Sequence, residues 1–123
     1  MARRVLIVDD EPNIVMSLEF LMKKAGFEVT VARNGREALD ALAGPPPDLL
    51  LLDVMMPEFD GYEVCERIRA DPAWASTTIF MLTARGRDSE RDRGLALGAD
   101  AYVTKPFSTR ELVAQIEAVM ASK

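Results

Sequence analysis

The sequence has no histidine and only one cysteine, and each shortage excludes a class of chemistry. Without histidine, the chain cannot form a serine–histidine catalytic pair, a histidine metal site or an imidazole proton shuttle. The single cysteine, Cys65, excludes an internal disulfide and argues against a metal site made of thiolates. Cys65 lies in a helical pattern, so we expect a small, packed hydrophobic side chain. Any chemistry must therefore use carboxylates, lysine, threonine or tyrosine.

Long apolar runs and an excess of positive charge are also absent. No apolar run approaches the ~20 residues of a membrane-spanning helix, and residues 1–4 lead directly into a strand-like segment rather than a signal peptide. We therefore expect a cytoplasmic protein without membrane contact. The net charge of −5 disfavours direct nucleic-acid binding, which requires a basic surface. The chain has 123 residues, 49% of them apolar, which is enough for one domain with a buried core.

Strand and helix signals alternate five times along the chain. The pattern predicts strands at 4–9, 28–32, 48–53, 78–83 and 101–104. It predicts helices at 12–25, 35–43, 61–70, 88–97 and 109–121. This alternation indicates an α/β fold, in which helices cover both faces of a parallel sheet. No repeat or shift in composition marks a second domain, so we expect residues 1–123 to form one domain without an output domain.

Helix caps support these boundaries. Pro12 suits the first turn of a helix. Three pairs have the spacing of a capping box, in which a polar residue is followed three positions later by glutamate: Asn34 with Glu37, Asp60 with Glu63, and Ser108 with Glu111.

The pattern of polar and apolar residues in each strand predicts the order of the strands in the sheet. Residues 5–8 and 49–52 are continuously apolar, as in central strands that are covered on both faces. Residues 28–32 alternate in polarity, and 101–104 is short and partly polar, so both suit the edges. We therefore predict a single doubly wound, flavodoxin-like fold with strand order 2-1-3-4-5.

Five polar residues directly follow or end the predicted strands. Asp9 ends the first strand, Asp10 follows it, and Asp53 ends the third. Thr83 ends the fourth, and Lys105 follows the fifth. Ligands of open α/β sheets bind outside the carboxyl ends of the strands, so these side chains should face one crevice. Each residue alone has an ordinary explanation, as a cap, a β-former or a solvated charge, but their coincidence at strand ends indicates a site.

The predicted crevice has the chemistry of a phosphoryl and metal site. Two carboxylates ~5 Å apart repel by about 3 kcal/mol at an effective dielectric constant of ~20, and Lys105 with a divalent cation would offset this repulsion. Because only oxygen ligands are present, Mg²⁺ or Mn²⁺ is favoured over zinc. Asp53 ends a central strand alone and is our candidate nucleophile for an acyl phosphate. Asp9 and Asp10 are better placed to hold the metal, and Thr83 could donate a hydrogen bond to the phosphate.

The sequence resembles the receiver domain of bacterial two-component response regulators across essentially its whole length. The matching segments are Val-Asp-Asp-Glu-Pro at 8–12, Asp-Val-Met-Met-Pro-Glu-Phe-Asp-Gly at 53–61, Leu-Thr-Ala at 82–84, Gly-Ala-Asp-Ala-Tyr at 98–102 and Lys-Pro-Phe at 105–107. The resemblance implies that Asp53 accepts a phosphoryl group from a phosphohistidine on a sensor histidine kinase or a histidine phosphotransfer protein. The absence of histidine fits a donor that is supplied by the partner.

The resemblance also assigns the metal ligands. Asp10 and Asp53 would bind Mg²⁺ through their side chains, Asp9 mainly through water, and Met55 through its backbone carbonyl. Lys105 would pair with the phosphate. The implied protein is a signalling switch that catalyses part of its own phosphorylation and dephosphorylation, and not an enzyme that turns over a separate substrate.

Further roles follow from the same resemblance. Thr83 and Tyr102 would form a switch pair, and Ala84 and Arg85 lie where the family tunes its dephosphorylation rate. Phosphorylation would then change the surface formed by the helix at 88–97, the strand at 101–104 and the helix at 109–121. That surface could act on a downstream target that the sequence does not reveal, or join two copies of the chain.

One feature of the helix at 12–25 suggests where a partner binds. Met16 and Phe20 are four residues apart and fall off the predicted inward stripe. The members of that stripe are Ile14, Leu18, Leu21 and Ala25. We hypothesise that Met16 and Phe20 form an apolar patch that docks a partner helix. Alternatively, Phe20 simply packs along the margin of its helix.

Two other functions stay open on the same fold. A flavin or nucleotide binder would lack the expected G-x-G-x-x-G and P-loop motifs, and it would leave Lys105 and the acidic crevice unexplained. A protein-interaction module that works without phosphorylation is the second alternative. The presence of all five strand-end residues argues against such a loss of chemistry.

Overall fold

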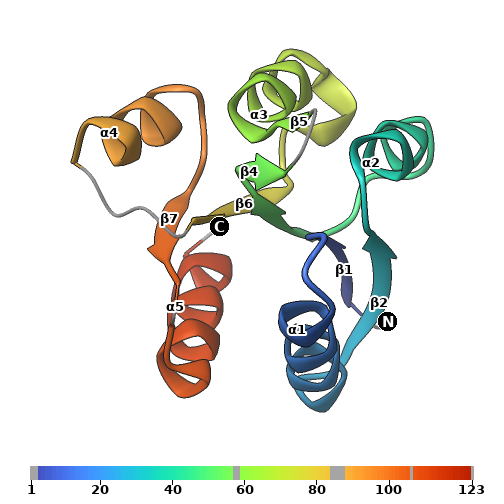
Figure 1. Ribbon diagram of the computed structural model, residues 1–123, viewed down its shortest axis with the longest axis vertical. Helices are drawn as coiled ribbons and strands as arrows, with labels where there is room; N and C mark the ends of the chain where they lie inside the picture. The colour runs from blue at the N-terminus through green and yellow to red at the C-terminus, as the bar shows by residue number, and fades with distance from the viewer. Residues whose placement is uncertain (1–2, 57–58, 84–87, 106, 123) are drawn as a thin grey trace.

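The computed structural model describes residues 3–56, 59–83, 88–105 and 107–122 (Figure 1). Its elements are β1 (Arg3–Val8), α1 (Pro12–Lys24), β2 (Phe27–Ala32), α2 (Gly35–Leu42), β3 (Leu49–Asp53), β4 (Met55–Met56), β5 (Phe59–Asp60), α3 (Gly61–Ala70), the 3-10 turn η1 (Pro72–Trp74), β6 (Thr78–Thr83), α4 (Asp88–Ala96), β7 (Ala101–Thr104) and α5 (Thr109–Ala121). All of the predicted strands and helices are present, with bounds within one residue of those expected from the sequence.

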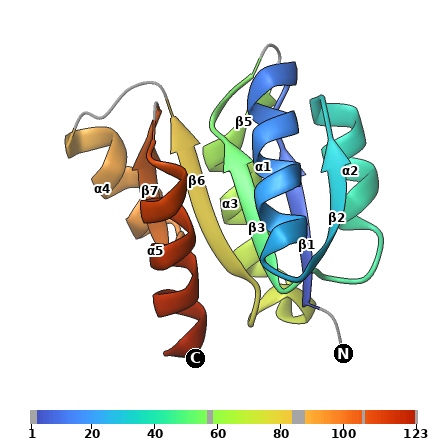
Figure 2. The same cartoon turned by 90° about the horizontal axis from the view of Figure 1, so that it is seen from below.

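The main sheet has the predicted topology. Its five strands are parallel and lie in the order β2-β1-β3-β6-β7, which is the doubly wound, flavodoxin-like order 2-1-3-4-5. The continuously apolar strands β1 and β3 are central, while β2 and β7 form the edges, as expected. Figure 2 shows the strands running in one direction, so their carboxyl ends share one edge of the sheet.

Helices cover both faces of this sheet. α1 and α5 lie on one face, and α2, α3 and α4 lie on the other (Figure 1). The core on the first face includes Ile7, Leu18, Leu51 and Ile116. The core on the second face includes Val8, Leu52, Cys65 and Met81. Successive strand residues therefore point to opposite cores, which explains why β3 needs an unbroken apolar run.

Cys65 is a packed core residue, as predicted. It is fully buried, and its Sγ lies 3.7 Å from the Leu97 carbonyl oxygen, to which the thiol donates. Burial raises the pKa of the Cys65 thiol above its usual value, with smaller effects from the nearby charges of Arg69 and Asp100. A higher pKa means less thiolate at neutral pH, so this cysteine is suited to packing rather than to chemistry.

The predicted caps are confirmed at three helices. Asn34 Oδ1 accepts from the Glu37 backbone N–H at 2.9 Å. Asp60 Oδ1 accepts from Tyr62 N–H at 2.9 Å. At α5, Ser108 Oγ accepts from Glu111 N–H at 3.4 Å. Each contact satisfies a donor that the first turn of a helix leaves without an intrahelical partner.

The inward face of α1 differs in part from the predicted stripe. Leu18 is fully buried as expected, and Ile14, Leu21 and Ala25 pack at the margin of the core. The other deeply buried positions are Val15 and Met22, which the prediction omitted. Residues 15, 18 and 22 follow the helical period, so the helix faces the sheet along this line.

Two short strands after β3 were not predicted. β4 and β5 form an antiparallel pair that joins Met55 to Asp60 and Met56 to Phe59. The pair brings the chain back so closely that a Cβ at Gly61 would lie 2.6 Å from the Val54 Cα. Gly61 is therefore required for α3 to begin directly beside the end of β3.

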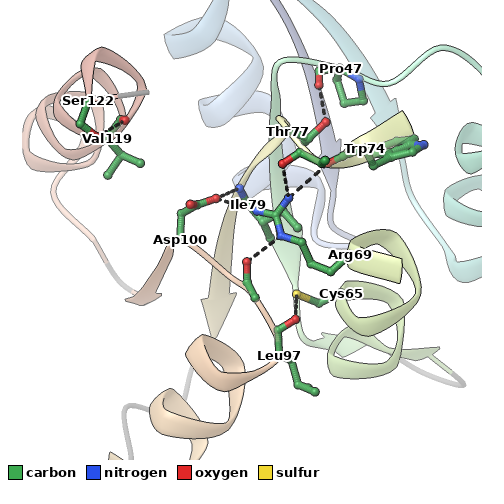
Figure 3. A network of polar contacts seen from close by, with 12 residues as sticks. Pro47, Cys65, Arg69, Trp74, Thr77, Ile79, Leu97, Asp100, Val119 and Ser122 are labelled. Carbon is green, nitrogen blue, oxygen red and sulfur yellow. Dashed lines mark hydrogen bonds and ion pairs between the residues drawn. The ribbon is translucent and has the colours of Figure 1, made fainter. Parts of the chain in front are cut away.

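A polar network joins the elements at the opposite, amino end of β6 and β7 (Figure 3). Figure 3 shows the Arg69 side chain extending from α3 into this network, where it donates to Asp100 Oδ2 at 2.9 Å and to the Trp74 carbonyl at 3.2 Å. Its Nε also donates to the Gly98 carbonyl at 2.8 Å. The same Asp100 oxygen accepts from the Ile79 backbone N–H at 2.8 Å. The network ties α3 to the starts of both strands.

Candidate functional site

Three carboxylates meet at the carboxyl edge of the sheet. Asp9 follows β1 and is fully buried, Asp53 ends β3 and is 5% exposed, and Asp10 is exposed. Within the described residues, these three side chains each offer an oxygen that lies within 4.8 Å of the others. They meet because β1 and β3 are neighbours in register, with Val8 opposite Leu52. The topology therefore places three negative charges in one partly buried space.

Lys105 completes this group from the far edge of the sheet. Its Nζ lies 2.9 Å from Asp9 Oδ2 and 3.5 Å from Asp53 Oδ2. Its backbone N–H donates to the Thr83 carbonyl at 2.6 Å, which holds Lys105 just beyond the last paired residues of β6 and β7. The lysine side chain is only 13% exposed, so these ion pairs are poorly screened by solvent.

The electrostatic environment keeps this lysine charged. Burial by itself lowers the pKa of Lys105, but the hydrogen bond to Asp9 and the negative charges of Asp53 and Asp9 outweigh it. The net effect raises the pKa of Lys105 above its usual value of 10.5. An ammonium therefore stands beside the two buried carboxylates at neutral pH.

The donor set fits a hard divalent cation. All three candidate side-chain ligands are carboxylates, and oxygen donors suit Mg²⁺ or Mn²⁺. The exposed Asp10 gives the group a side that faces solvent, from which an ion can enter. Asp9 also accepts from the Glu11 backbone N–H at 3.0 Å, which fixes its carboxylate at the start of α1. Met55, whose carbonyl the resemblance suggests as a ligand, lies two residues beyond Asp53 in β4.

Thr83 and Tyr102, the predicted switch pair, lie on the neighbouring strands β6 and β7. Thr83 ends β6, is fully buried and pairs in register with Thr104 of β7. Tyr102 lies on β7 on the α3 and α4 side of the sheet, where it is half-buried. Ala84 and Arg85, the predicted rate-tuning residues, lie outside the residues that the structure describes.

Sequence reasoning missed a tyrosine that contacts the predicted switch residue Tyr102. Tyr62, in the first turn of α3, places its hydroxyl oxygen 2.8 Å from that of Tyr102. The only local signal was its position directly after the capping Asp60 and Gly61.

A family model for the response regulator receiver domain matches residues 5–117. The chain belongs to this family. Receiver domains are modules of two-component signalling systems, phosphorylation is a general property of the family, and they generally bind Mg²⁺ through an acidic pocket. In this chain, Asp9, Asp10 and Asp53 form an acidic group that could hold a metal ion. The match favours neither a flavin or nucleotide site nor a module without phosphorylation.

Solved structures of receiver domains closely resemble this one. A proposed response regulator from Chloroflexus aurantiacus is 39% identical with a TM-score of 0.90, and the match covers 98% of this chain and 99% of that one. CheY4, a chemotaxis protein of Vibrio cholerae, is 32% identical with a TM-score of 0.87, and the match covers 97% and 99%. The BeF3-activated receiver domain of DrrB is 30% identical with a TM-score of 0.88, and the match covers 98% and 99%. Across the described part of this receiver domain, no helix has the length and apolar character needed to cross a bilayer.

Proposed function

We propose that this receiver domain is a phosphorylation-controlled switch that acts in the cytoplasm. Asp53 accepts the phosphoryl group from a phosphohistidine on a sensor histidine kinase or a histidine phosphotransfer protein, in a reaction that depends on Mg²⁺ or Mn²⁺. The observation that carries this proposal is the position of Asp53, whose carboxylate lies 3.5 Å from Lys105 Nζ and within a three-carboxylate group. The absence of histidine from the chain agrees with a donor that lies on the partner.

Different residues of the chain act as nucleophile, charge partner and hydrogen-bond donor in the transfer. An Asp53 carboxylate oxygen attacks phosphorus, and the bond to the partner's imidazole nitrogen breaks with its electron pair left on nitrogen. Lys105 balances the negative charge on the phosphoryl oxygens, and the Thr83 hydroxyl donates a hydrogen bond to one of them. Asp10, Asp53 and the Met55 carbonyl would hold the metal directly, with Asp9 acting mainly through water. When bound, the metal supplies positive charge beside the same oxygens.

Phosphorylation would then change the surface of α4, β7 and α5. The group adds roughly −1.5 to −2 of charge and new acceptor oxygens beside Thr83. Thr83 moves toward these oxygens, and Tyr102 fills the space that Thr83 leaves. A change at one end of the sheet thereby biases this surface between two arrangements, which can recruit a downstream target or a second copy of the chain.

A small phosphodonor tests the proposal without any partner. Incubation with acetyl phosphate and Mg²⁺ should add one phosphoryl group, measured by intact mass, whereas removal of the metal with EDTA should prevent the addition. The similarity to the BeF3-activated DrrB receiver domain supports this expectation. No addition under either condition would favour a module that interacts with partners independently of phosphorylation.

The surface of α1 is our proposed docking site for the phosphodonor. Met16 is 69% exposed and Phe20 is 70% exposed, which confirms that both side chains lie off the inward face. α1 begins at Pro12, and only its N-cap residue Glu11 separates it from the carboxylates Asp9 and Asp10. A partner helix that packs on this patch would therefore bring its phosphohistidine close to Asp53.

Phe20→Ala should slow phosphotransfer from a histidine kinase that phosphorylates the wild-type chain. We expect about a tenfold decrease, because truncating a central aromatic side chain of an interface commonly costs more than 1 kcal/mol. Phosphorylation by acetyl phosphate, which needs no docking, should be unchanged. Leu39→Ala, at another exposed hydrophobic residue on α2, is the matched control and should behave as wild type. Equal slowing with both donors would contradict docking on α1.

A further inference from the structure

The two tyrosines of the sequence are bonded to each other across the α3 and α4 side of the sheet. The Tyr62 and Tyr102 hydroxyl oxygens are 2.8 Å apart, and either group can be the donor. Tyr62 is 6% exposed and belongs to the core on this side, and Tyr102 packs against that core from the edge strand β7. A tyrosine in such a place needs a partner for its hydroxyl. This contact therefore favours the orientation seen here, in which the Tyr102 ring packs against the core and which we call the buried orientation.

An arginine of α4 covers the same tyrosine. The Arg93 guanidinium carbon lies 4.2 Å from the centre of the Tyr62 ring. It also lies near the cap of α3, with one nitrogen 3.9 Å from Asp60 Oδ2. The Arg93 side chain is 59% exposed, so the ion pair contributes little stability. Its effect is positional, because it places α4 over the first turn of α3.

The next residue of α4 contacts Tyr102 directly. A Cβ at Gly94 would lie 3.0 Å from Tyr102 Cδ2 and 2.8 Å from Met81 Sδ. The α4 backbone therefore packs against the Tyr102 ring without an intervening side chain. Because the ring touches α4 while its hydroxyl contacts α3, neither the orientation of Tyr102 nor the position of α4 can change without affecting the other.

We propose that Tyr62 is a positioning residue of the switch, and that its hydroxyl sets how often Tyr102 occupies the buried orientation. The proposal rests on the function proposed above for Asp53, Thr83 and Tyr102. When Thr83 moves toward the phosphate, the buried orientation of Tyr102 is the one that fills the vacated space. Tyr62 thereby links the first turn of α3 to the α4 surface.

Removing the Tyr62 hydroxyl should weaken the active arrangement. A neutral hydrogen bond contributes about 1 kcal/mol, which is about fivefold in an equilibrium. A ligand that selects the buried orientation then binds more weakly, because part of its binding free energy has to replace the lost hydrogen bond. We therefore expect Tyr62→Phe to reduce the affinity for beryllofluoride with Mg²⁺ by up to about fivefold, while the aromatic ring preserves the core.

The chain has two tyrosines, so the environment of Tyr102 can be followed directly by ¹⁹F NMR. Protein labelled with 3-fluorotyrosine has two ¹⁹F resonances, and Tyr62→Phe leaves only that of Tyr102. This resonance should move toward the position of a solvent-exposed tyrosine, with or without beryllofluoride. In a Tyr102→Phe background, Tyr62→Phe should reduce beryllofluoride affinity less than it does in the wild-type chain, because the bond between the two hydroxyls is already absent.

The outcomes separate this proposal from the one on which it rests. An unchanged Tyr102 resonance in Tyr62→Phe, or effects of the two substitutions that simply add, would overturn the role of Tyr62. If wild-type protein does not bind beryllofluoride, the proposed function is contradicted instead. The Tyr102 resonance in Tyr62→Phe would still show whether Tyr62 positions Tyr102. Urea unfolding of each variant shows whether a general loss of stability explains any change.

Discussion

Asp53→Asn should abolish phosphorylation by acetyl phosphate and by a histidine kinase. The side-chain amide is a poor nucleophile, and the substitution also removes one of the three charges that would hold the metal. Asparagine has almost the same shape as aspartate, so the contacts around β3 should persist. Intact mass after incubation with Mg²⁺ should show no added phosphoryl group.

The matched control for this variant is Asp40→Asn, which makes the same chemical change at an exposed position on α2. It should be phosphorylated as wild type. If Asp53→Asn still gained a phosphoryl group at a comparable rate, the acceptor would have to be another residue, and the assignment of the site would be wrong.

Lys105→Met should have the second large effect, on both reaction and stability. Loss of the ammonium should slow phosphorylation by about 10²-fold or more, as when a donor to developing negative charge is removed. Asp9 is fully buried, and its carboxylate lies 2.9 Å from Lys105 Nζ. Removing one partner of such a pair typically costs about 3 kcal/mol, because the remaining charge stays buried. Urea unfolding without metal should show this loss, and Mg²⁺ should recover part of it.

The pH dependence gives this prediction a second measurement. The folded-state pKa of Lys105 is raised above 10.5, so its contribution to stability is fully present below that value and is lost as the pH rises through the folded-state pKa. The stability difference between wild type and Lys105→Met should therefore be constant near neutral pH and should shrink in strongly alkaline solution. Lys23→Met removes a 62% exposed lysine that pairs with Glu19 on α1, and should cost only about 0.5 kcal/mol. A similarly small cost for Lys105→Met would contradict the ion-pair account.

The sequence predicted the architecture because its strongest signals agree with one another. Residues 49–52 are apolar without a break, and in the structure β3 is buried on both faces. Capping residues such as Asn34 and Asp60 then fixed where helices begin. Once the strand order is predicted, the topology alone brings the residues at the strand ends to one edge, so the sequence is sufficient to predict that the carboxylates and Lys105 lie together.

Other features had no local signal. β4 and β5 contribute only two residues each, which is too short for any periodicity to reveal. The deeper burial of Val15 and Met22 depends on how α1 is rotated against the sheet, and the sequence does not fix that angle. The Tyr62–Tyr102 contact joins residues forty positions apart on elements that meet only after folding. Such tertiary contacts between side chains are set by packing, and the hydrophobic pattern does not encode them.

The structure of the protein with Mg²⁺ and beryllofluoride tests the central claim most directly. The account predicts beryllofluoride on an Asp53 carboxylate oxygen, in contact with Lys105 and Thr83, and a metal held by Asp10, Asp53 and the Met55 carbonyl. Beryllofluoride bound elsewhere, or an Asp53 carboxylate that carries neither ligand at saturating concentrations, would contradict it.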